Sequence, residues 1–426
     1  MINVRLLGVF LVCLTLIGCS SSDSPTPIGE QGETIHLLGA VGVNEVIIGL
    51  LEKKLSASHI KVEKNFFYWD TYLAKARLAI MNDTGEYDLI LGPCSQLLNF
   101  YYSGKILPLN DPAERADYKL NSLYPQLRNI AVSDGKIYIL PYLADTLIYI
   151  YRSDLYKKAG ISPPRTIKEM YDTGKRLTVG DIYGLAFPAN PGDSASSIWS
   201  YFLWSNGGEY FDRSWRPLLN SQPAVAATQM YTQILKDCAP LAAATWQTEE
   251  AVNFFASGRL AAMILWSGST YFLNDNNRSK VAGKVKYAPL PVGLSGRAIP
   301  RLESWGVVIP RRSKHIVAAK KFCQTLISRS FLEEYADMGM APTPAIDINL
   351  RFAAKAPEKP LAVAAKYLAV ARDRPNIPEA VQYIPIIGSG LNDILMGADL
   401  QDTLNTINRQ IEGVMQTGGY YKTTVK

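Results

Sequence analysis

The stretch YDLILGP, residues 87–93, decides which fold class the sequence predicts. Its core is apolar without alternation, and a Gly-Pro pair ends it. A short unbroken apolar run of this kind is typical of a parallel strand that is covered on both faces. Outward from it, residues 34–38 and 60–62 predict two further strands, and residues 45–55 and 72–81 predict amphipathic helices between them. This βαβαβ order predicts a mostly parallel sheet sandwiched by helices.

A second set of strands and helices begins near residue 147. Residues 147–151 and 260–265 predict strands. Thr166 and Glu169 have the spacing of a capping box, and Thr248 is the expected cap of a later helix. The chain of 426 residues is long enough for two domains with buried cores. We therefore predict two α/β bodies.

Three loops follow predicted strands directly, where α/β sheets bind their ligands. They comprise residues 39–44, which end in Asn44, residues 92–96, and residues 266–269. These loops are expected to lie at the binding edge of the two sheets.

The bulk composition describes a globular protein, with 48% hydrophobic and 19% charged residues. The formal net charge of +6 is small and scattered. The densest basic stretch, residues 311–321, has no interleaved aromatic residues, so a solvated helix face is favoured over a nucleic-acid footprint. We expect no nucleic-acid partner and a monomer.

The first twenty residues predict export and anchoring. Arg5 precedes an apolar run over residues 6–17, which is too short to span a bilayer as a helix but has the shape of a secretory signal. Cys19 directly follows Leu-Ile-Gly, which resembles the lipobox of bacterial lipoproteins. Residues 1–18 are therefore expected to be removed, Cys19 to carry lipid, and residues 19–33 to form a flexible tether. The expected location is outside the cytoplasm, on a membrane.

Motifs of a reactive site are missing from the sequence. There are three histidines without metal-binding spacing, and no nucleophile elbow, P-loop or dinucleotide motif occurs. We therefore expect no catalytic residue, no cofactor and no metal. A pair of carboxylates for glycoside hydrolysis stays open, because their separation is a spatial property.

Aromatic residues are abundant instead, with 7 Trp, 24 Tyr and 13 Phe. A sugar offers a flat C–H face to a ring and hydroxyls to polar side chains at the rim. Each ring taken alone is as well explained by core packing. Together, the rings in predicted loops and at strand ends favour a binding cleft, namely Trp69, Trp199, Trp266, Trp305 and Tyr383.

Several segments resemble the sugar-type extracellular solute-binding proteins of ABC importers, which include maltose-binding protein. SGRLAAMILWSG at residues 257–268 is similar to that family's G-K-A-A-M-x-x-x-W-S-G stretch. Further matches run in family order along nearly the whole mature chain: YRSDLYKKAG at 151–160, LWSNGG at 203–208, SKVAGKV at 279–285, SWG at 304–306, APT at 341–343 and RPNIP at 374–378.

The resemblance implies a periplasmic-binding-protein-like fold of type II, in which two α/β domains with mostly parallel sheets close on a ligand. Hinges are implied near residues 144–146, 303–307 and 343–346. Domain I would then comprise residues 34–146 and 304–342, and domain II residues 147–303 and 343–426.

The resemblance also implies roles for individual residues. Trp266 would stack on a sugar with Ser267 hydrogen-bonding nearby, Trp305 would form the cleft floor, and Glu303 and Asp145 would accept hydroxyls. The loop with Cys94 and Ser95 lacks the carboxylate that relatives often have there, which puts maltose specificity in doubt. Both residues are still expected to bind ligand, and for Cys94 a small apolar group lining the cleft is favoured over a simply buried thiol. The remaining expected ligand-binding residues are Asn44, Trp69, Asp70, Trp199 and Tyr383.

The function implied is capture of a sugar or polyol without turnover and delivery to the membrane permease of an ABC importer. Two alternatives stay open at this point. One is a glycan-processing lipoprotein enzyme at the cell surface, and the other is a sensory receptor that keeps the binding-protein fold.

Overall fold

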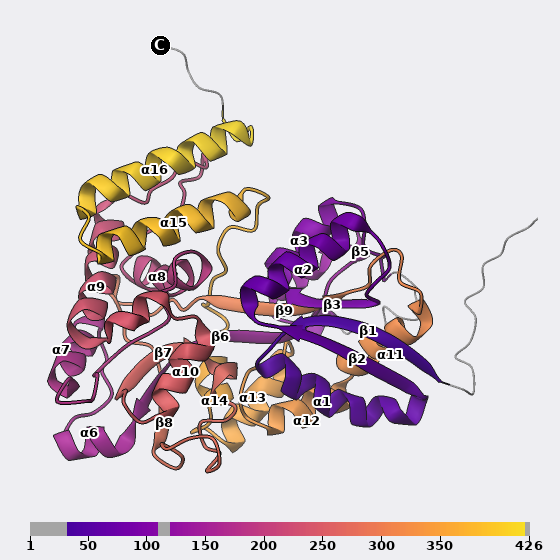
Figure 1. Cartoon of the computed structure of the whole chain (residues 1–426), viewed down its shortest axis with the longest axis horizontal. Helices are drawn as coiled ribbons and strands as arrows, with labels where there is room; N and C mark the ends of the chain where they lie inside the picture. The colour runs from indigo at the N-terminus through magenta and orange to yellow at the C-terminus, as the bar shows by residue number, and fades with distance from the viewer. Residues whose placement is uncertain (1–31, 110–119, 422–426) are drawn as a thin grey trace, which may run out of the picture.

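The computed structural model describes residues 32–109 and 120–421. The expected leader, the expected lipidation site Cys19 and all but the last two residues of the expected tether lie outside the described residues. Figure 1 shows two lobes, joined in the centre by β6 and β9. The first lobe begins with β1 (Glu33–Ala40), α1 (Val43–Leu55), β2 (Ile60–Phe67), α2 (Trp69–Asn82), β3 (Leu89–Pro93) and α3 (Cys94–Tyr102), which confirms the predicted βαβαβ order.

The chain then crosses to the second lobe and returns. The crossing segment contains α5 (Pro125–Ala131), β4 (Val132–Ser133), β5 (Lys136–Ile137) and β6 (Leu140–Arg152). The second lobe contains α6 (Ser153–Ala159), α7 (Ile167–Leu177), α8 (Asp193–Ser205), α9 (Gln222–Cys238), α10 (Thr248–Ala256), β7 (Ala262–Trp266) and β8 (Val285–Ala288). The return to the first lobe comprises β9 (Leu302–Val308), α11 (Ile316–Leu326), α12 (Arg329–Asp337) and α13 (Ile346–Lys355). The chain ends with α14 (Pro360–Ala365), α15 (Ala380–Leu395) and α16 (Leu400–Thr417).

One strand, β6, belongs to the ladders of both lobes. Its first half, Leu140 to Thr146, pairs with β9, and its second half pairs with β7 and β8. The sheet order is β2-β1-β3-β9-β6-β7, with β8 also on β6. Only the β1–β2 and β1–β3 pairs of this sheet are parallel. The prediction of mostly parallel pairing therefore fails at the crossing, because β9 runs antiparallel to both β3 and β6.

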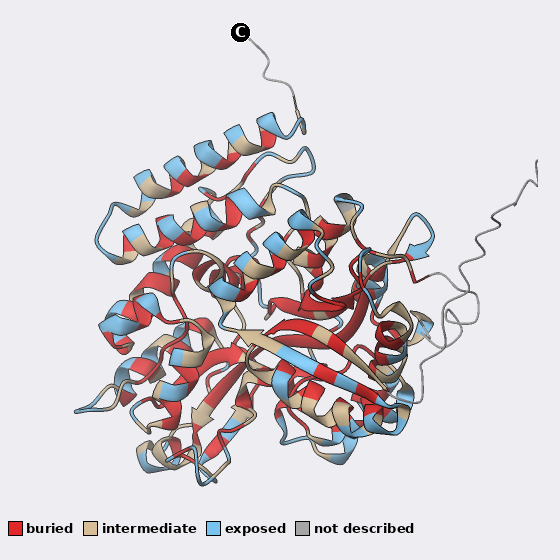
Figure 2. Cartoon of the chain, turned by 45° about the vertical axis from the view of Figure 1, so that its right-hand side comes forward, coloured by how far each residue is buried: buried red, intermediate tan, exposed pale blue. Residues whose placement is uncertain are grey.

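Both faces of the first sheet are buried, as the unbroken apolar run of β3 predicted. Leu89 and Leu91 lie in the core beneath α1 and α11, whereas Ile90 lies in the core on the opposite face with Tyr72 of α2. Side chains alternate between the faces of a strand, so one short run serves two cores. Figure 2 shows the strands largely buried and the helices exposing their outer faces.

The two helix starts predicted from caps are largely as expected. Thr166 caps α7, and its hydroxyl accepts a hydrogen bond from the Glu169 N–H. The cap of α10 is Gln247 rather than Thr248, which is the first residue of the helix. Glu250 completes that capping box by accepting from the Gln247 N–H at 2.9 Å.

The cores depart from the predicted domain division at one place. Residues 147–299 and most of the C-terminal helices share one hydrophobic cluster. Ile348 and Phe352 of α13 instead pack in the cluster of the first lobe, although the sequence assigned everything after residue 343 to the second domain. The chain therefore crosses back after α13 rather than before it.

Candidate functional site

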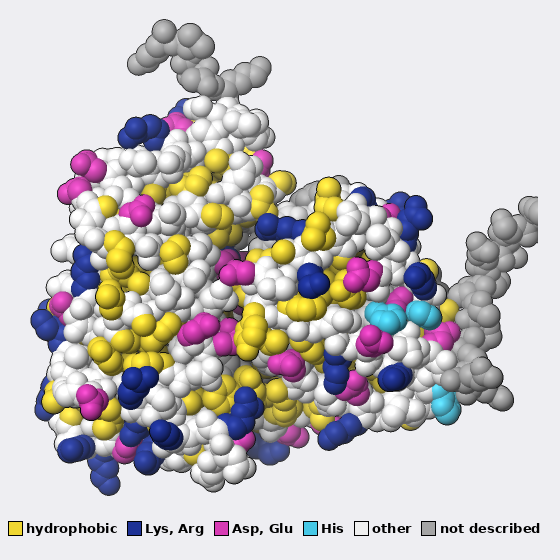
Figure 3. Space-filling view, in the orientation of Figure 1, with side chains coloured by type: hydrophobic (Ala, Val, Ile, Leu, Met, Phe, Trp, Pro, Cys, Tyr) yellow, Lys and Arg dark blue, Asp and Glu magenta, His cyan; other side chains and the backbone are white. Residues whose placement is uncertain are grey.

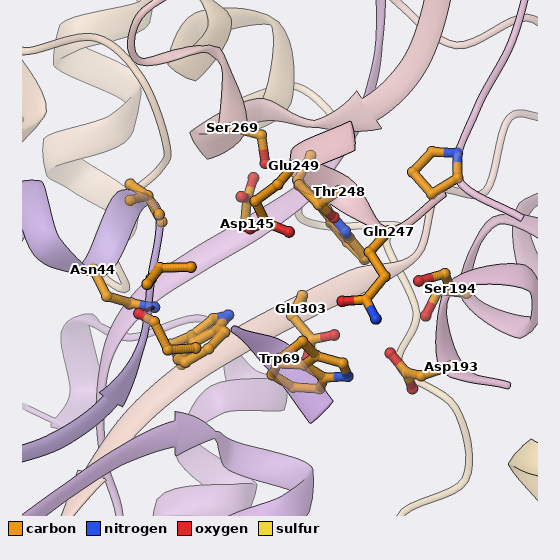
Figure 4. Close-up of a pocket in the computed structure, with 18 of the residues that line it drawn as sticks. Asn44, Trp69, Asp145, Asp193, Ser194, Gln247, Thr248, Glu249, Ser269 and Glu303 are labelled. Atoms are coloured by element: carbon orange, nitrogen blue, oxygen red, sulfur yellow. Dashed lines mark hydrogen bonds between the residues drawn. The ribbon is translucent and has the colours of Figure 1, made fainter. Parts of the chain in front are cut away.

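A cavity lies where the two lobes meet at the crossing strands. It encloses about 870 Å³, including the solvent at its mouth. The space-filling view shows the surface hollowed between the lobes (Figure 3), and the close-up shows polar side chains converging on the cavity (Figure 4). Its lining comprises Ala40, Val41, Gly42, Val43, Asn44, Trp69, Asp145, Pro188, Asp193, Ser194, Ser197, Ile198, Gln247, Thr248, Glu249, Trp266, Ser269, Glu303 and Trp305.

Three half-buried indoles form the apolar part of the lining. Trp69 begins α2, and its ring meets the ring of Trp305 edge-on at 5.9 Å between centroids. Tyr72 supports both rings from behind, at 5.7 Å and 6.3 Å. Trp266 ends β7 on the opposite lobe and lies 5.8 Å from the guanidinium carbon of the buried Arg301. The structure thus brings together three of the predicted aromatic residues from both lobes.

Asp145 lies buried in β6 at the crossing point. Its carboxylate accepts from the Thr146 N–H at 2.8 Å, the Gly268 N–H at 3.0 Å and the Ser267 hydroxyl. Burial raises the pKa of Asp145 to about 6, against the lowering effect of these donors. A Cβ at Gly268 would lie 2.8 Å from Oδ2, so the approach of this backbone to the carboxylate requires glycine.

Glu303 lies in β9 on the cavity floor, and its side chain is 12% exposed. Its Oε2 lies 3.1 Å from Nη2 of the fully buried Arg301, which also lies 3.1 Å from Asp373. None of the described residues donates a hydrogen bond to the buried Oε1 of Glu303. Burial raises the pKa of Glu303 to about 7, and Asp373 and Asp193 add to this rise, while Arg301 opposes it. One carboxylate oxygen of Glu303 is therefore left without a donor at the cavity floor.

Asp193 is held differently, at the start of α8. Its Oδ1 accepts from the guanidinium of Arg374 at 2.6 Å. Burial would raise its pKa, but Arg374 and then Arg301 outweigh burial and hold the pKa below its ordinary value. Asp193 is consequently a charged acceptor in the wall of the second lobe.

The lining is acidic throughout. It contains the four carboxylates of Asp145, Asp193, Glu249 and Glu303, and no Lys, Arg or His of residues 32–109 and 120–421 lines it. Three helices start at the cavity, and the first turns of α1, α8 and α10 each contain an acid, namely Glu45, Asp193 and Glu249. The positive helix ends are thus already matched by negative side chains. This surface disfavours an anionic ligand.

Asn44 lines the cavity, but its amide is already satisfied within the first lobe. The Tyr142 hydroxyl donates to its Oδ1 at 2.5 Å, and its Nδ2 donates to the Ala40 carbonyl at 3.4 Å. Asp70 and Ser267 lie next to the lining rather than in it: Ser267 is fully buried against Asp145, and Asp70 accepts from Gln247 at the mouth.

Four predicted residues lie away from the cavity. The Trp199 indole N–H donates to Thr228 inside the second lobe, and the Tyr383 hydroxyl donates to the Pro375 carbonyl. Cys94 is fully buried behind β9, where burial raises the pKa of its thiol to about 12. Ser95 lies beside a separate pocket near residues 373–384. These predictions are corrected because ring type and loop position do not distinguish a core side chain from a cleft side chain.

Sequence reasoning missed several lining residues of the second lobe. Asp193 and Ser194 follow the turn at Gly192, and Gln247, Thr248 and Glu249 form the start of α10. Both segments carry a recognisable helix start, with an acid in the first turn. That signal places a helix end but does not tell which helix end faces the cleft.

No helix among the described residues is long and apolar enough to cross a membrane. No group of three or more His, Cys, Asp or Glu side chains in the same residues could hold a metal ion.

Comparison with known proteins gives concordant results. Residues 45–331 match the family model of the bacterial extracellular solute-binding proteins. A probable amino-acid ABC transporter periplasmic-binding protein of Sinorhizobium fredii is 26% identical over 96% of each chain. The mannitol-binding protein of Pseudomonas aeruginosa is 26% identical over 75% of this chain and 74% of its own length.

A solved structure also matches over most of the chain. The ABC transporter solute-binding protein of Agrobacterium radiobacter, in complex with ribitol, has a TM-score of 0.80 at 25% identity and covers 90% of this chain and 99% of its own. The shared architecture is the type II periplasmic-binding-protein fold, as predicted.

Proposed function

Because the chain belongs to the bacterial extracellular solute-binding proteins, we propose that it captures a sugar or polyol in the cavity between its lobes and passes it unchanged to an ABC permease. The observation that carries this proposal is the lining of that cavity. It combines three indoles with four carboxylates, one of which has a buried oxygen that no described residue donates to. Rings take the C–H face of a sugar, and carboxylates accept its hydroxyls.

Contacts from both lobes give the ligand its role in closure. Trp69 and Trp305 belong to the first lobe. Trp266, Asp193 and Glu249 belong to the second lobe. A ligand that touches both sets stabilises the closed arrangement, in proportion to its preference for that arrangement. The permease would recognise this closed form, as in a hinge-closing binding protein.

The charges favour a neutral ligand over an amino acid, although one relative is described as a probable amino-acid binder. An α-carboxylate needs a cation or free donors, and no cationic side chain of the described residues lines the cavity. Arg301 lies behind the wall, where Glu303 and Asp373 already pair with it. Mannitol and ribitol, which two similar proteins bind by name, carry no charge.

The proposal includes an anchor outside the described residues. Lipid on Cys19 would hold the protein at the outer face of a membrane, beside its permease, and the protein would act as a monomer. Processing that stays unchanged when lipoprotein signal peptidase is blocked by globomycin would contradict the anchor but not the binding function.

A thermal-shift and calorimetry screen tests the function directly. The purified protein is titrated with ribitol, D-mannitol, D-tagatose, D-glucose and representative amino acids. We expect saturable binding of at least one sugar or polyol, with about 2.7 kcal/mol of added stability at a hundredfold excess over Kd. Binding of amino acids with no response to any sugar or polyol would refute the proposal.

A further inference from the structure

One hydrogen bond joins the two lobes across the mouth of the cavity. The Gln247 side-chain amide donates to Oδ2 of Asp70 at 2.8 Å, although the two residues are 177 positions apart in the chain. Figure 4 shows Gln247 reaching across the site from the second lobe. On the first-lobe side, Asp70 follows Trp69 in the first turn of α2.

A second chamber begins on the other side of this bridge. It encloses about 770 Å³ including open solvent, and it lies between α2, α3 and α15. The chamber shares Trp69, Asp193, Ser194 and Gln247 with the inner cavity. The Gln247–Asp70 bridge therefore lies on the boundary between two parts of one groove.

Both partners of the bridge are fixed by their helix ends. Gln247 caps α10, its backbone N–H is held by Glu250, and the preceding Trp246 stacks on Phe254 at 4.8 Å. Asp70 is placed by Trp69, whose ring is held between Tyr72 and Trp305. The backbone positions of both partners are therefore fixed, and only their side chains must be ordered when the bridge forms.

The outer chamber has the chemistry to receive an additional unit. Arg77 and Gln96 supply donors from the first lobe, Asn190 supplies an amide from the second, and Val381 and Ile384 form an apolar wall. It lacks Trp305, and with it the edge-on indole pair of the inner cavity. It could hold the extension of a longer ligand only while the bridge is open.

We propose that the Asp70–Gln247 bridge determines ligand length: when closed, it seals the inner cavity around one sugar ring or one polyol chain and excludes oligosaccharides from the outer chamber. This inference rests on the proposed function and specifies the ligand class of the same site. Neither residue needs to contact a small ligand for the bridge to act. The bridge penalises a longer ligand, because such a ligand must break it to pass.

The experiment compares each single-unit probe with its own glucosylated form. Binding of D-mannitol, sorbitol and D-glucose is measured against glucosyl-mannitol, maltitol and maltose by calorimetry. The wild-type protein is expected to bind its best single-unit probe about tenfold or more tightly than the glucosylated form. Gln247→Ala and Asp70→Ala are each expected to reduce this ratio about tenfold.

Two further variants test whether the change in the ratio comes from the Asp70–Gln247 bridge or from a general disturbance of the fold. Asp70→Asn keeps an acceptor for the Gln247 amide, so it should retain the wild-type ratio. Asn220→Ala removes a comparable exposed hydrogen bond to Asn405, far from the cavity, and should also leave the ratio unchanged.

Each outcome has a defined meaning. Two results would overturn the proposal that the bridge determines ligand length, while leaving sugar binding intact. One is wild-type protein that binds a glucosylated probe as tightly as the single unit, and the other is an unaltered ratio in Gln247→Ala. If neither form of any probe binds, the proposed function fails and the proposal on ligand length fails with it.

Discussion

The carboxylates of Asp88 and Glu303 are both buried, yet they have opposite surroundings. Asp88, just before β3, accepts from the His36 N–H at 3.0 Å, the Ser313 hydroxyl at 2.8 Å and the Lys314 N–H at 3.0 Å. His315 approaches the same carboxylate with both its backbone N–H and its ring. Burial would raise the pKa of Asp88, but these hydrogen bonds outweigh it and hold the pKa below its ordinary value.

Glu303 pairs with Arg301 and has one oxygen to which no described residue donates, and burial raises its pKa to about 7. Donors of the first lobe satisfy Asp88 completely, whereas one oxygen of Glu303 has no donor among the described residues. Asp88 therefore joins the end of the sheet near β3 to the segment before α11, whereas Glu303 keeps an oxygen to which no described residue donates. Perturbed carboxylates of the second kind mark functional sites more often than structural ones.

Removing the Asp88 carboxylate, the structural one of the two, should have the largest effect. Asp88→Ala leaves several buried donors without an acceptor, so we expect the free energy of unfolding to fall by about 3 kcal/mol. Urea denaturation measures this loss. Asp172→Ala, which removes an exposed pair with Lys168, should change stability by about 0.5 kcal/mol or less. Equal losses in the two variants would show that Asp88 is not a structural centre.

The pH dependence of stability should separate the two carboxylates next. Folded protein retains protons on Glu303 and Asp145 that the unfolded chain has already lost between their ordinary pKa values and about 7 and 6. Stability should therefore fall as the pH rises through that window. Asp88 acts in the opposite sense, since its stabilisation is lost as the pH falls below about 4.

Glu303→Gln is the matched variant for this profile. It should flatten the decline between pH 5 and about 7 and leave the acid limb unchanged. A profile for Glu303→Gln that overlays the wild type throughout would mean that Glu303 does not titrate in this range.

Removing a ring tests the apolar half of the site. Trp266→Ala should weaken binding of the cognate sugar or polyol by about 1.5 kcal/mol, because the indole would no longer cover the C–H face. Calorimetry measures the change. Trp215→Ala removes an indole that packs on Phe211 and Tyr420 outside the cavity, so it should leave the Kd unchanged. An unchanged Kd in Trp266→Ala would remove this ring from the site.

The smallest expected effect concerns the free acceptor itself. Glu303→Gln keeps the side-chain shape but replaces a charged acceptor, so we expect binding to weaken about tenfold. Glu209→Gln alters another arginine-paired glutamate, on Arg372 and outside the cavity, and should leave binding unchanged. Binding that is equally strong in Glu303→Gln would place the hydroxyl contact elsewhere.

Features set by a local sequence pattern were predictable, whereas features set by contacts between distant segments were not. The strand at residues 87–93 was predictable because its two cores impose an unbroken apolar run. The pairing of β6 with strands of both lobes was not predictable, because its own residues do not indicate which strands it pairs with. Nor does any local signal tell that α13 packs on the first lobe.

The candidate site was predictable at the crossing strands and less so elsewhere. Asp145, Glu303 and Trp305 were expected because they lie at the crossings that the resemblance implied. Trp199 was misplaced, although eleven consecutive residues of α8 are buried, and a helix buried all round was readable from its apolar and small residues. Glu249 was missed because no local signal tells that the start of α10 faces the cavity.

Native mass spectrometry of the purified protein, incubated with an equimolar mixture of sugars, polyols and amino acids, tests the central claim most directly. We expect one bound neutral sugar or polyol of unchanged mass, recovered intact after release and lost in the Trp266→Ala variant. A bound amino acid, a ligand of altered mass, or undiminished retention of the sugar or polyol by Trp266→Ala would contradict it.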